Sequence, residues 1–225
     1  MSSIRLADAA KFYKEQPHQI AAWNALEQDL SPKQLEDFAE LYRAAPPVKA
    51  SLIKNPLSVK WQSQLDNKSG TGYRECFSSS CAMLAMFWNK VANDDAYNAI
   101  RSRYGDSTEA QAQLLALRSL GLKANFHTDG TPAKLEAEID AGRPVAVGWL
   151  HHGPANAASG GGHWTVIIGY TAAAWIQNDP NGEATLVNGG YSANTKGAGV
   201  VYSRANWNPR WMPGGTGGWY LTCAA

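Results

Sequence analysis

The cysteines and histidines are the side chains of this sequence best suited to nucleophilic chemistry. They are three and five in number, and they stand at Cys76, Cys81 and Cys223 and at His18, His127, His151, His152 and His163. Their spacing matches no zinc-binding pattern, and three cysteines cannot all pair, so we expect free thiols. A free cysteine in a sequence that also offers histidine and Asp or Asn is a candidate nucleophile.

Cys76 is the better nucleophile. Apolar side chains nearly encircle a helix over residues 76–91, which predicts a buried central helix that starts in earnest after the N-cap region Ser78–Ser80. Cys76 and Cys81 are separated by about 140° of helical rotation, so they cannot both face one histidine. Cys81 lies in an apolar run and is expected to be an inert core thiol. Cys76 follows a polar loop near a helix N-terminus, a setting that lowers a thiol pKa.

His163 and Asp179 are predicted to complete a catalytic group with Cys76. Residues 163–170 and 173–179 have the composition of strands, and a tight hairpin between them places His163 opposite Asp179. Opposed residues have Cβ atoms about 5 Å apart, close enough for a carboxylate to orient an imidazole. A register shift of one residue would select Asn178 instead, and either side chain can fill this role.

Side-chain amides upstream of Cys76 could stabilise an oxyanion. Gln64 and Gln62 are the two available, and the sequence leaves the choice open. His151 and His152 are adjacent and are expected to point to opposite faces of a strand, so we expect no metal and no cofactor. Residues 153–162 are rich in small side chains and are predicted to gate the cleft.

Helices precede strands along the chain, which predicts an α+β domain with a mostly antiparallel sheet packed on the cysteine-bearing helix. We expect an N-terminal helical segment over 1–48 and a catalytic domain over 58–225. The expected strands are 122–127, 144–150, 163–170, 173–179 and 218–223. The expected helices include 18–30, 32–44 with a Ser31–Gln34 capping box, 108–120 with a Thr108–Gln111 box, and a helix from Thr131–Pro132 to Gly142.

Charge and hydropathy exclude several function classes. The formal net charge is +1, from 20 basic and 19 acidic residues, and no basic run occurs, so we expect no nucleic-acid partner. The most apolar stretch, residues 81–88, is too short to span a bilayer. The first residues lack the apolar region of a signal peptide, so we expect synthesis in the cytoplasm. A monomer is expected.

Four segments resemble the papain-like cysteine peptidases of the C39-like type: WQSQLDN, ECFSSSCAMLAMFW, GGHWTVIIGY and IQNDP. The resemblance implies a papain-like fold, with Gln64 as oxyanion donor, Cys76 as nucleophile, His163 as base and Asp179 as its orienting partner. The sequence departs from the family at Phe77 and Ser78, where the family often has Gly-Pro.

The segment AAKFYKEQPHQIAAWNALEQ is similar to a helical stretch of bacterial and phage cell-wall lytic proteins. It implies peptidoglycan as substrate, cut by an endolysin-like enzyme that a holin releases to the wall. Among nine tryptophans, Trp164, Trp207 and Trp211 are the candidates for substrate binding. The alternatives are a C39-like protease that processes proteins or leader peptides, and a non-catalytic wall-binding or virion protein.

Overall fold

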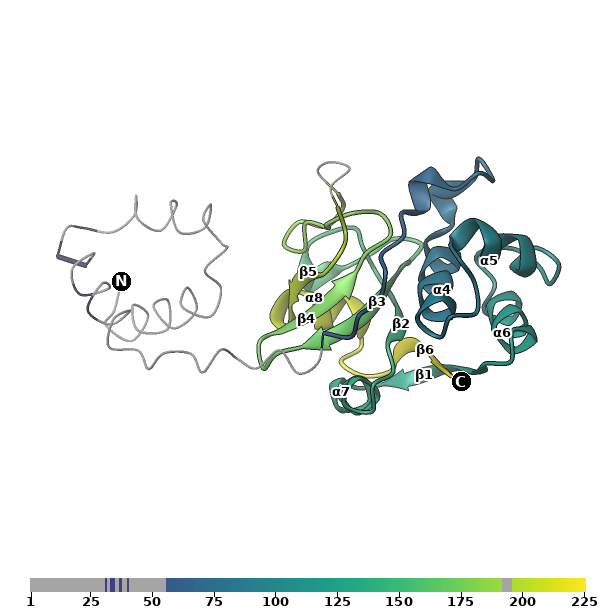
Figure 1. Cartoon of the computed structure of the whole chain (residues 1–225). Coiled ribbons are helices and arrows are strands. Elements are labelled where there is room, and N and C mark those ends of the chain that lie inside the picture. The colour runs from purple at the N-terminus through teal and green to yellow at the C-terminus, as the bar shows by residue number, and fades with distance from the viewer. Residues whose placement is uncertain (1–30, 32, 35–36, 38–39, 41–55, 192–195) are drawn as a thin grey trace. The chain divides into compact units, whose positions relative to one another are not determined.

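The computed structural model describes residues 56–191 and 196–225, together with the single positions 31, 33, 34, 37 and 40 (Figure 1). Its contacts divide the chain between residues 52 and 53. The predicted helical segment 1–48 and its boundary fall almost entirely outside the described residues and stay predictions. One detail is confirmed: the Gln34 N–H donates to Ser31 Oγ at 3.4 Å and the Ser31 N–H donates to Gln34 Oε1 at 3.0 Å, as in a capping box.

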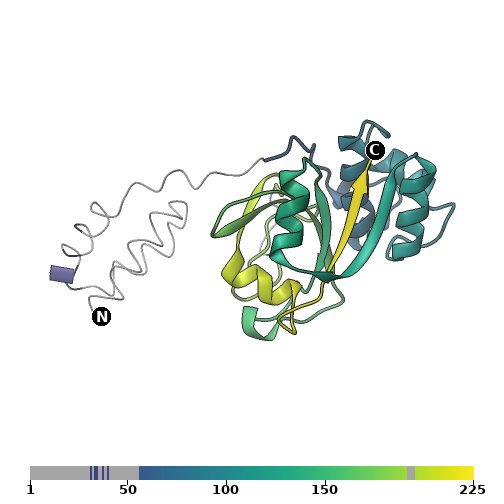
Figure 2. The same ribbon diagram turned by 90° about the horizontal axis from the view of Figure 1, so that it is seen from below.

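The described residues form one six-stranded sheet with the order β1-β6-β2-β3-β4-β5, in which all neighbours are antiparallel. The strands are β1 (Lys123–Gly130), β2 (Val145–Trp149), β3 (His163–Tyr170), β4 (Ala174–Asn178), β5 (Val200–Ser203) and β6 (Gly218–Ala224). The five predicted strands are therefore confirmed. The C-terminal strand β6 lies beside β1 and inserts between it and β2 (Figure 2). Strand β5 is not among the predicted strands, because its four residues follow a glycine-rich stretch and are too few to show an alternating pattern.

Helices cover both faces of the sheet, which confirms the α+β prediction. They are α4 (Cys76–Phe87), α5 (Asp94–Arg101), α6 (Ala110–Ser119), α7 (Pro132–Asp140) and α8 (Arg204–Trp211), with short 3-10 turns η1 (Gln64–Asp66), η2 (Gly72–Arg74) and η3 (Ala155–Ala157). Helices α4 and α6 contact one face and α5 packs on them, while α7 and α8 contact strands from the other side (Figure 1). In this part of the chain no helix is both long and apolar enough to cross a bilayer.

Strand β3 separates two hydrophobic cores. Val166 and Ile168 belong to the core that contains α4, whereas Ile167 belongs to the core that contains Trp175 and Trp207. All eight residues of β3 are buried, as expected of a central strand with both faces covered. The strand that begins at His163 is thus held rigidly from both sides.

The start of α4 differs from the prediction. The helix begins at Cys76 itself, and Ser78, Ser79 and Ser80 are fully buried within it. Ser78 Oγ accepts hydrogen bonds from Arg101 Nε at 3.1 Å and Gln113 Nε2 at 2.9 Å. Serine favours the N-cap position in general, but here Ser78 and Ser79 bond polar side chains of the neighbouring helices from inside α4, so the predicted N-cap region is wrong.

Two further helix details test the predicted caps. Helix α6 has Glu109 as N-cap with no side-chain capping bond, and Thr108 instead donates its hydroxyl to Asp106 Oδ1 at 2.7 Å. The Thr108–Gln111 box is therefore wrong. In contrast, Thr131 caps α7 as predicted, because its side chain accepts from the Lys134 N–H.

Candidate active site

Cys76 occupies a position unlike that of the other two cysteines. It is the first residue of α4 and is partly exposed, whereas Cys81 and Cys223 are buried. Backbone N–H groups of a first helical turn lack intrahelical partners and form the positive end of the helix. Burial raises the pKa of Cys81 well above its ordinary value and that of Cys223 to about 12. At neutral pH these two remain thiols, which leaves Cys76 as the reactive candidate.

The loop that leads to Cys76 is held by a buried carboxylate. Glu75 is 1% exposed and accepts hydrogen bonds from Asn67 Nδ2 at 2.6 Å, Ser69 Oγ at 2.8 Å and Thr71 Oγ1 at 2.9 Å. The Arg101 guanidinium lies 3.8 Å from it. Glu75 therefore fixes the loop directly before the candidate nucleophile, a role that no motif in the sequence indicated.

His163 lies between Cys76 and Asp179. Its Nε2 atom is 2.8 Å from Asp179 Oδ1, and both side chains are buried. Because Nε2 is engaged by the carboxylate, Nδ1 is the ring nitrogen left to face Cys76, whose side chain also helps to raise the pKa of the imidazole. The structure thus brings together the three residues that the sequence proposed, in the order thiol, imidazole, carboxylate.

The surroundings of His163 favour its charged form. Burial by itself lowers the pKa of this imidazole, but the negative charge and hydrogen bond of Asp179, together with Cys76, outweigh burial and raise the pKa to about 10. His163 is therefore an imidazolium at neutral pH. An imidazolium next to a cysteine at a helix N-terminus stabilises the thiolate, which is the nucleophilic form.

The β3–β4 register differs from the predicted one, but His163 and Asp179 are still in contact. Val166 pairs with Asn178 and Ile167 with Gln177, with an irregularity before Gly169. Continuing this register, His163 and Asp179 are diagonal neighbours two residues out of direct opposition. A shift of two residues keeps every side chain on its face of the sheet, whereas a shift of one would not. Diagonal neighbours are still within reach of long side chains.

Asp179 accepts four hydrogen bonds. Besides the imidazole, the Asn181 N–H donates to Oδ1 at 2.9 Å, and the hydroxyls of Tyr191 and Tyr202 donate to Oδ2 at 2.9 and 2.8 Å. Burial, and then the charge of Asp179, raise the pKa of both tyrosines, so they stay protonated donors. The sequence indicated neither: Tyr191 lies in a glycine-rich loop, and Tyr202 lies in the unpredicted strand β5.

Asn178, the alternative to Asp179, points elsewhere. Its Nδ2 donates to the Val59 carbonyl and its Oδ1 accepts from the Gly199 N–H, both at 2.9 Å. The carboxamide is thereby used to hold two chain segments together. In the structure it is Asp179 that contacts the histidine.

The upstream glutamines are placed differently from each other. Gln64 is 3% exposed, its Nε2 donates to the Gly72 carbonyl at 2.8 Å, and its Oε1 is buried without a hydrogen-bond partner. Its backbone N–H donates to the Pro180 carbonyl at 2.9 Å, which ties this segment to the turn after Asp179. Gln62 Oε1 instead accepts from the Asp94 N–H at 3.2 Å, beside a separate surface pocket. A second N–H on Gln64 Nε2 remains for an oxyanion; that role stays a prediction.

Comparisons with known proteins agree with this geometry. Residues 56–206 match the sequence profile of the Peptidase_C39-like family. The chain belongs to this family. A comparison with curated protein sequences gives no match.

Among solved structures, a protein described as a C39-like peptidase, from Bacillus anthracis, is similar with a TM-score of 0.52 and 15% identity, over 75% of this chain and 95% of that one. A double-glycine-motif protease from an AMS/PCAT transporter, solved with its leader peptide, has a TM-score of 0.49, 20% identity and coverages of 75% and 92%. The peptidase domain of Streptococcus ComA, a bifunctional ABC transporter, has a TM-score of 0.49, 16% identity and coverages of 74% and 98%. The fold of this C39-like peptidase is thereby shown.

A second histidine of the C39-like peptidase lies beside the first. The ring centroids of His151 and His163 are 5.6 Å apart, and those of His151 and His152 are 3.9 Å apart. The expectation that the adjacent pair points to opposite faces is wrong, because both residues lie beyond the end of β2. Burial first, and then the charge of His163, lower the pKa of His151 to about 4, so this ring is neutral. No group of three potential metal-binding side chains occurs among the described residues.

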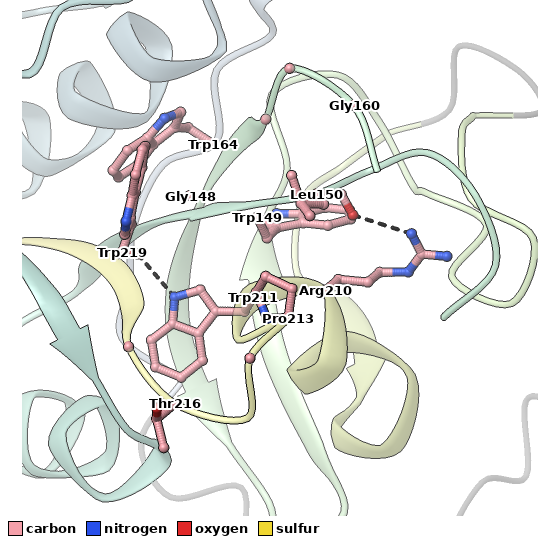
Figure 3. Close-up of a pocket in the computed structure, with 14 residues that line it drawn as sticks. Gly148, Trp149, Leu150, Gly160, Trp164, Arg210, Trp211, Pro213, Thr216 and Trp219 are labelled. Carbon is pink, nitrogen blue, oxygen red and sulfur yellow. Dashed lines mark hydrogen bonds between the residues drawn. The ribbon is translucent and has the colours of Figure 1, made fainter. Parts of the chain in front are cut away.

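Four indole rings line a pocket of about 400 Å³ (Figure 3), and the residues on either side of His163, Gly162 and Trp164, are among its lining residues. The indole rings belong to Trp149, Trp164, Trp211 and Trp219. Of the three tryptophans predicted to bind substrate, Trp164 and Trp211 therefore line the pocket. Trp207 does not: it is fully buried in the core, stacked on Trp211, so its placement on a binding surface is corrected.

Three glycines of the predicted gating loop, Gly160–Gly162, also line this pocket. At its other end the loop is tied down, because Arg210 Nη2 donates to the Gly153 carbonyl at 2.6 Å and His152 pairs with Ser159. Motion of the loop as a gate stays a prediction.

Proposed function

We propose that this C39-like peptidase hydrolyses amide bonds of polypeptides with Cys76 as nucleophile, His163 as acid and base, and Asp179 as the group that orients His163. The observation that carries the proposal is the position of the His163 ring, whose Nε2 lies 2.8 Å from a buried carboxylate oxygen and whose pKa the neighbouring Cys76 side chain helps to raise.

The reaction proceeds in two stages. The Cys76 thiolate attacks the carbonyl carbon, and as the tetrahedral intermediate collapses the C–N bond breaks and His163 gives its proton to the leaving amine. The acyl group remains on sulfur as a thioester. Neutral His163 then removes a proton from water, which attacks the thioester and releases the acid and the thiolate. Asp179 stays ionised and holds the ring in place.

The negative charge on the carbonyl oxygen needs donors in both stages. The backbone N–H of Cys76 belongs to the unpaired first turn of α4, and the free N–H of Gln64 Nε2 is the side-chain candidate. Two features support Gln64 over Gln62. Its side chain is buried next to η2, directly before Cys76, and its backbone is bonded to the turn that carries Asp179.

Polypeptides are favoured over peptidoglycan by the pocket next to His163. Its walls are four indoles, glycines and single Leu, Pro, Arg and Thr residues, a surface suited to an apolar side chain. Support for wall lysis comes from residues 9–28, which lie outside the described residues. Wall hydrolysis by an endolysin-like route is therefore the second candidate, and both candidates use the same acyl-enzyme chemistry.

Digestion of purified cell walls and of casein side by side, with mass spectrometry of the products, separates the two substrate classes. We expect peptide products from casein, while the cell walls should stay intact. Release of muropeptides would establish wall hydrolysis instead. Cys76→Ala is expected to abolish either activity, while Cys223→Ala, which removes a buried thiol of β6, should keep most of it. A Cys76→Ala variant that cleaves at the wild-type rate contradicts the proposal.

A non-catalytic role makes the opposite prediction for thiol reactivity. The proposed enzyme has one activated thiol, so iodoacetamide should label Cys76 much faster than Cys81 and Cys223 at neutral pH. Equal and slow labelling of all three would favour a binding protein on the same scaffold.

A further inference from the structure

We propose that the tryptophan pocket, defined by Trp149, Trp164, Trp211 and Trp219, binds one large aromatic side chain of a polypeptide substrate and thereby selects the bond that is cut. This inference rests on the proposed peptidase function. It adds a substrate class: polypeptides that carry Trp, Tyr or Phe at one fixed position relative to the cleaved bond.

Two of the tryptophans that line the pocket also contact the catalytic residues or their neighbours. The Trp149 ring meets the His163 ring edge-on with centroids 5.6 Å apart. On the other wall, Trp164 stacks on Phe77, with centroids 3.6 Å apart and planes 7° apart, and Phe77 directly follows Cys76. Two lining tryptophans therefore contact His163 and the residue after Cys76, which places the pocket beside the catalytic residues.

Glycines keep the pocket open. A Cβ atom on Gly148 would come within 2.8 Å of the Trp164 ring, so only glycine lets that indole lie flat against β2. Gly161 and Gly214, by contrast, line the pocket without a positive φ angle, and a Cβ atom added to either would meet no heavy atom within 4 Å. Larger residues can be introduced at these two positions without backbone strain, and they would occupy free space.

The guanidinium and two of the four indole N–H groups of the pocket are already used in hydrogen bonds. Arg210 donates hydrogen bonds to the backbone carbonyls of Leu150, His152, Gly153 and Leu186. The indole N–H of Trp149 donates to Thr165, and that of Trp211 donates to the Trp219 carbonyl (Figure 3). Thr216 carries the one hydroxyl among the lining residues, and none of these residues is a carboxylate or carboxamide.

The small number of remaining polar side-chain groups favours one of two occupants that indole rings can bind. A sugar presents hydroxyl groups that need hydrogen-bonding partners, and groups buried without partners cost free energy. An aromatic side chain needs few or none and gains from contact with the indole rings. A volume of about 400 Å³ lies near the lower end of the usual range for ligand sites, which suits a single large side chain.

The test is cleavage-site profiling with a peptide library made from a digested proteome. Among the peptides that the wild-type protein cuts, Trp, Tyr or Phe should be enriched at least fivefold at one position relative to the cleaved bond. In Trp219→Ala, which removes a half-exposed indole, and in Gly161→Leu, which fills the pocket, this enrichment should disappear. Within each variant, peptides without an aromatic residue are the internal reference, and the loss is measured as the fall in the ratio of aromatic to non-aromatic peptides cut. Tyr104→Ala, which removes an exposed ring outside the pocket, is the matched control and should keep the wild-type profile.

Each outcome has one meaning. Cleavage without enrichment, or enrichment that survives in both pocket variants, overturns the pocket proposal and leaves the peptidase intact. Absence of all cleavage together with slow alkylation of Cys76 overturns the peptidase function itself. If purified muropeptides quench the indole fluorescence of the wild type but not of Gly161→Leu, and aromatic peptides do not, the pocket binds sugar and the inference is wrong.

Discussion

The catalytic centre and the tryptophan pocket share a boundary but are built by opposite means. Around Asp179 the side chains are positioned by hydrogen bonds, four of them to one carboxylate. In the pocket the rings are positioned by close packing against glycines, and most of the hydrogen bonds that its side chains make go to backbone carbonyls. Hydrogen bonds to a buried charge depend steeply on geometry, whereas apolar contacts vary gradually with area. Changes at the centre should therefore alter rate, and changes in the pocket should alter selectivity.

The largest effect that separates the two regions is expected from Asp179→Asn. The amide cannot balance an imidazolium, so the pKa of His163 falls from about 10 and the thiolate loses its counter-ion. We expect kcat/KM to fall by about 10²- to 10⁴-fold, as when the acid of a comparable triad is neutralised. The measurement is hydrolysis of one good peptide, followed by profiling of the residual products.

The matched control is Asp106→Asn, which removes an exposed carboxylate that pairs with Arg74. It should retain kcat/KM within about twofold, because exposed ion pairs contribute little. If Asp179→Asn changes the preferred residue at the cleavage site, the catalytic centre also determines selectivity. The division of rate and selectivity between the two regions would then be wrong.

Arg210→Met tests how strongly the buried guanidinium stabilises the chain segment that follows β2. The guanidinium is fully buried and donates to the carbonyls of Leu150, His152, Gly153 and Leu186, so its loss leaves these carbonyl groups without this donor. Each buried unpaired group costs about 1–3 kcal/mol, so the loss of donors to four carbonyl groups should lower the free energy of unfolding by about 4 kcal/mol or more. Urea denaturation measures it. Arg143→Met, which breaks a pair with Glu138 at a more exposed site, should cost less than about 1 kcal/mol. Equal losses in both variants would contradict the role of Arg210.

Tyr191→Phe should have a smaller effect on rate. It removes one of four donors to Asp179 and leaves the ring in place, so the carboxylate is held less firmly but stays ionised. We expect kcat to fall about three- to tenfold with little change in KM, and the double variant with Tyr202→Phe to lose more. Tyr104→Phe serves as the control. A rise in KM with unchanged kcat would show that Tyr191 contacts substrate instead of positioning Asp179.

The sequence predicts correctly the features that depend on local patterns of residues. It misses contacts between segments that are distant along the chain. The helix that carries Cys76 and the strand that begins at His163 follow from apolar periodicity and β-rich composition. The His163–Asp179 contact follows from the sequence despite a register error, because an error of two residues preserves the face of the sheet.

Tyr191, Tyr202 and Glu75 could not be found in this way. Tyr191 and Tyr202 reach Asp179 from a glycine-rich loop and from a four-residue strand, neither of which has a periodic pattern. The partners of Glu75 lie in the preceding loop and in α5, so its buried position depends on tertiary packing. Composition suggests aromatic substrate contacts, but which indoles line the tryptophan pocket depends on how β2 and β6 pair.

The smallest expected effect concerns the two neighbouring histidines, whose pKa values move in opposite directions. The folded-state pKa of His163, about 10, is above its unfolded value, so its contribution to stability is complete below pH 6.5 and is lost as the pH rises toward 10. His151 has a folded-state pKa of about 4, so the unfolded state takes up the proton first, and stability falls as the pH drops from 6.5 to 4.

His151→Gln removes the contribution of this histidine to the fall in stability at acid pH and leaves the alkaline side unchanged. Urea midpoints measured between about pH 4 and 10 should therefore show a shallower decline below about pH 6.5 in this variant than in the wild type, and an unchanged decline on the alkaline side. His152→Gln, which replaces the neighbouring ring, is the control and should follow the wild-type curve. If His151→Gln instead alters the alkaline limb, the neutral ring supports the imidazolium of His163 directly. The catalytic centre would then extend one residue further toward the tryptophan pocket than its hydrogen bonds indicate.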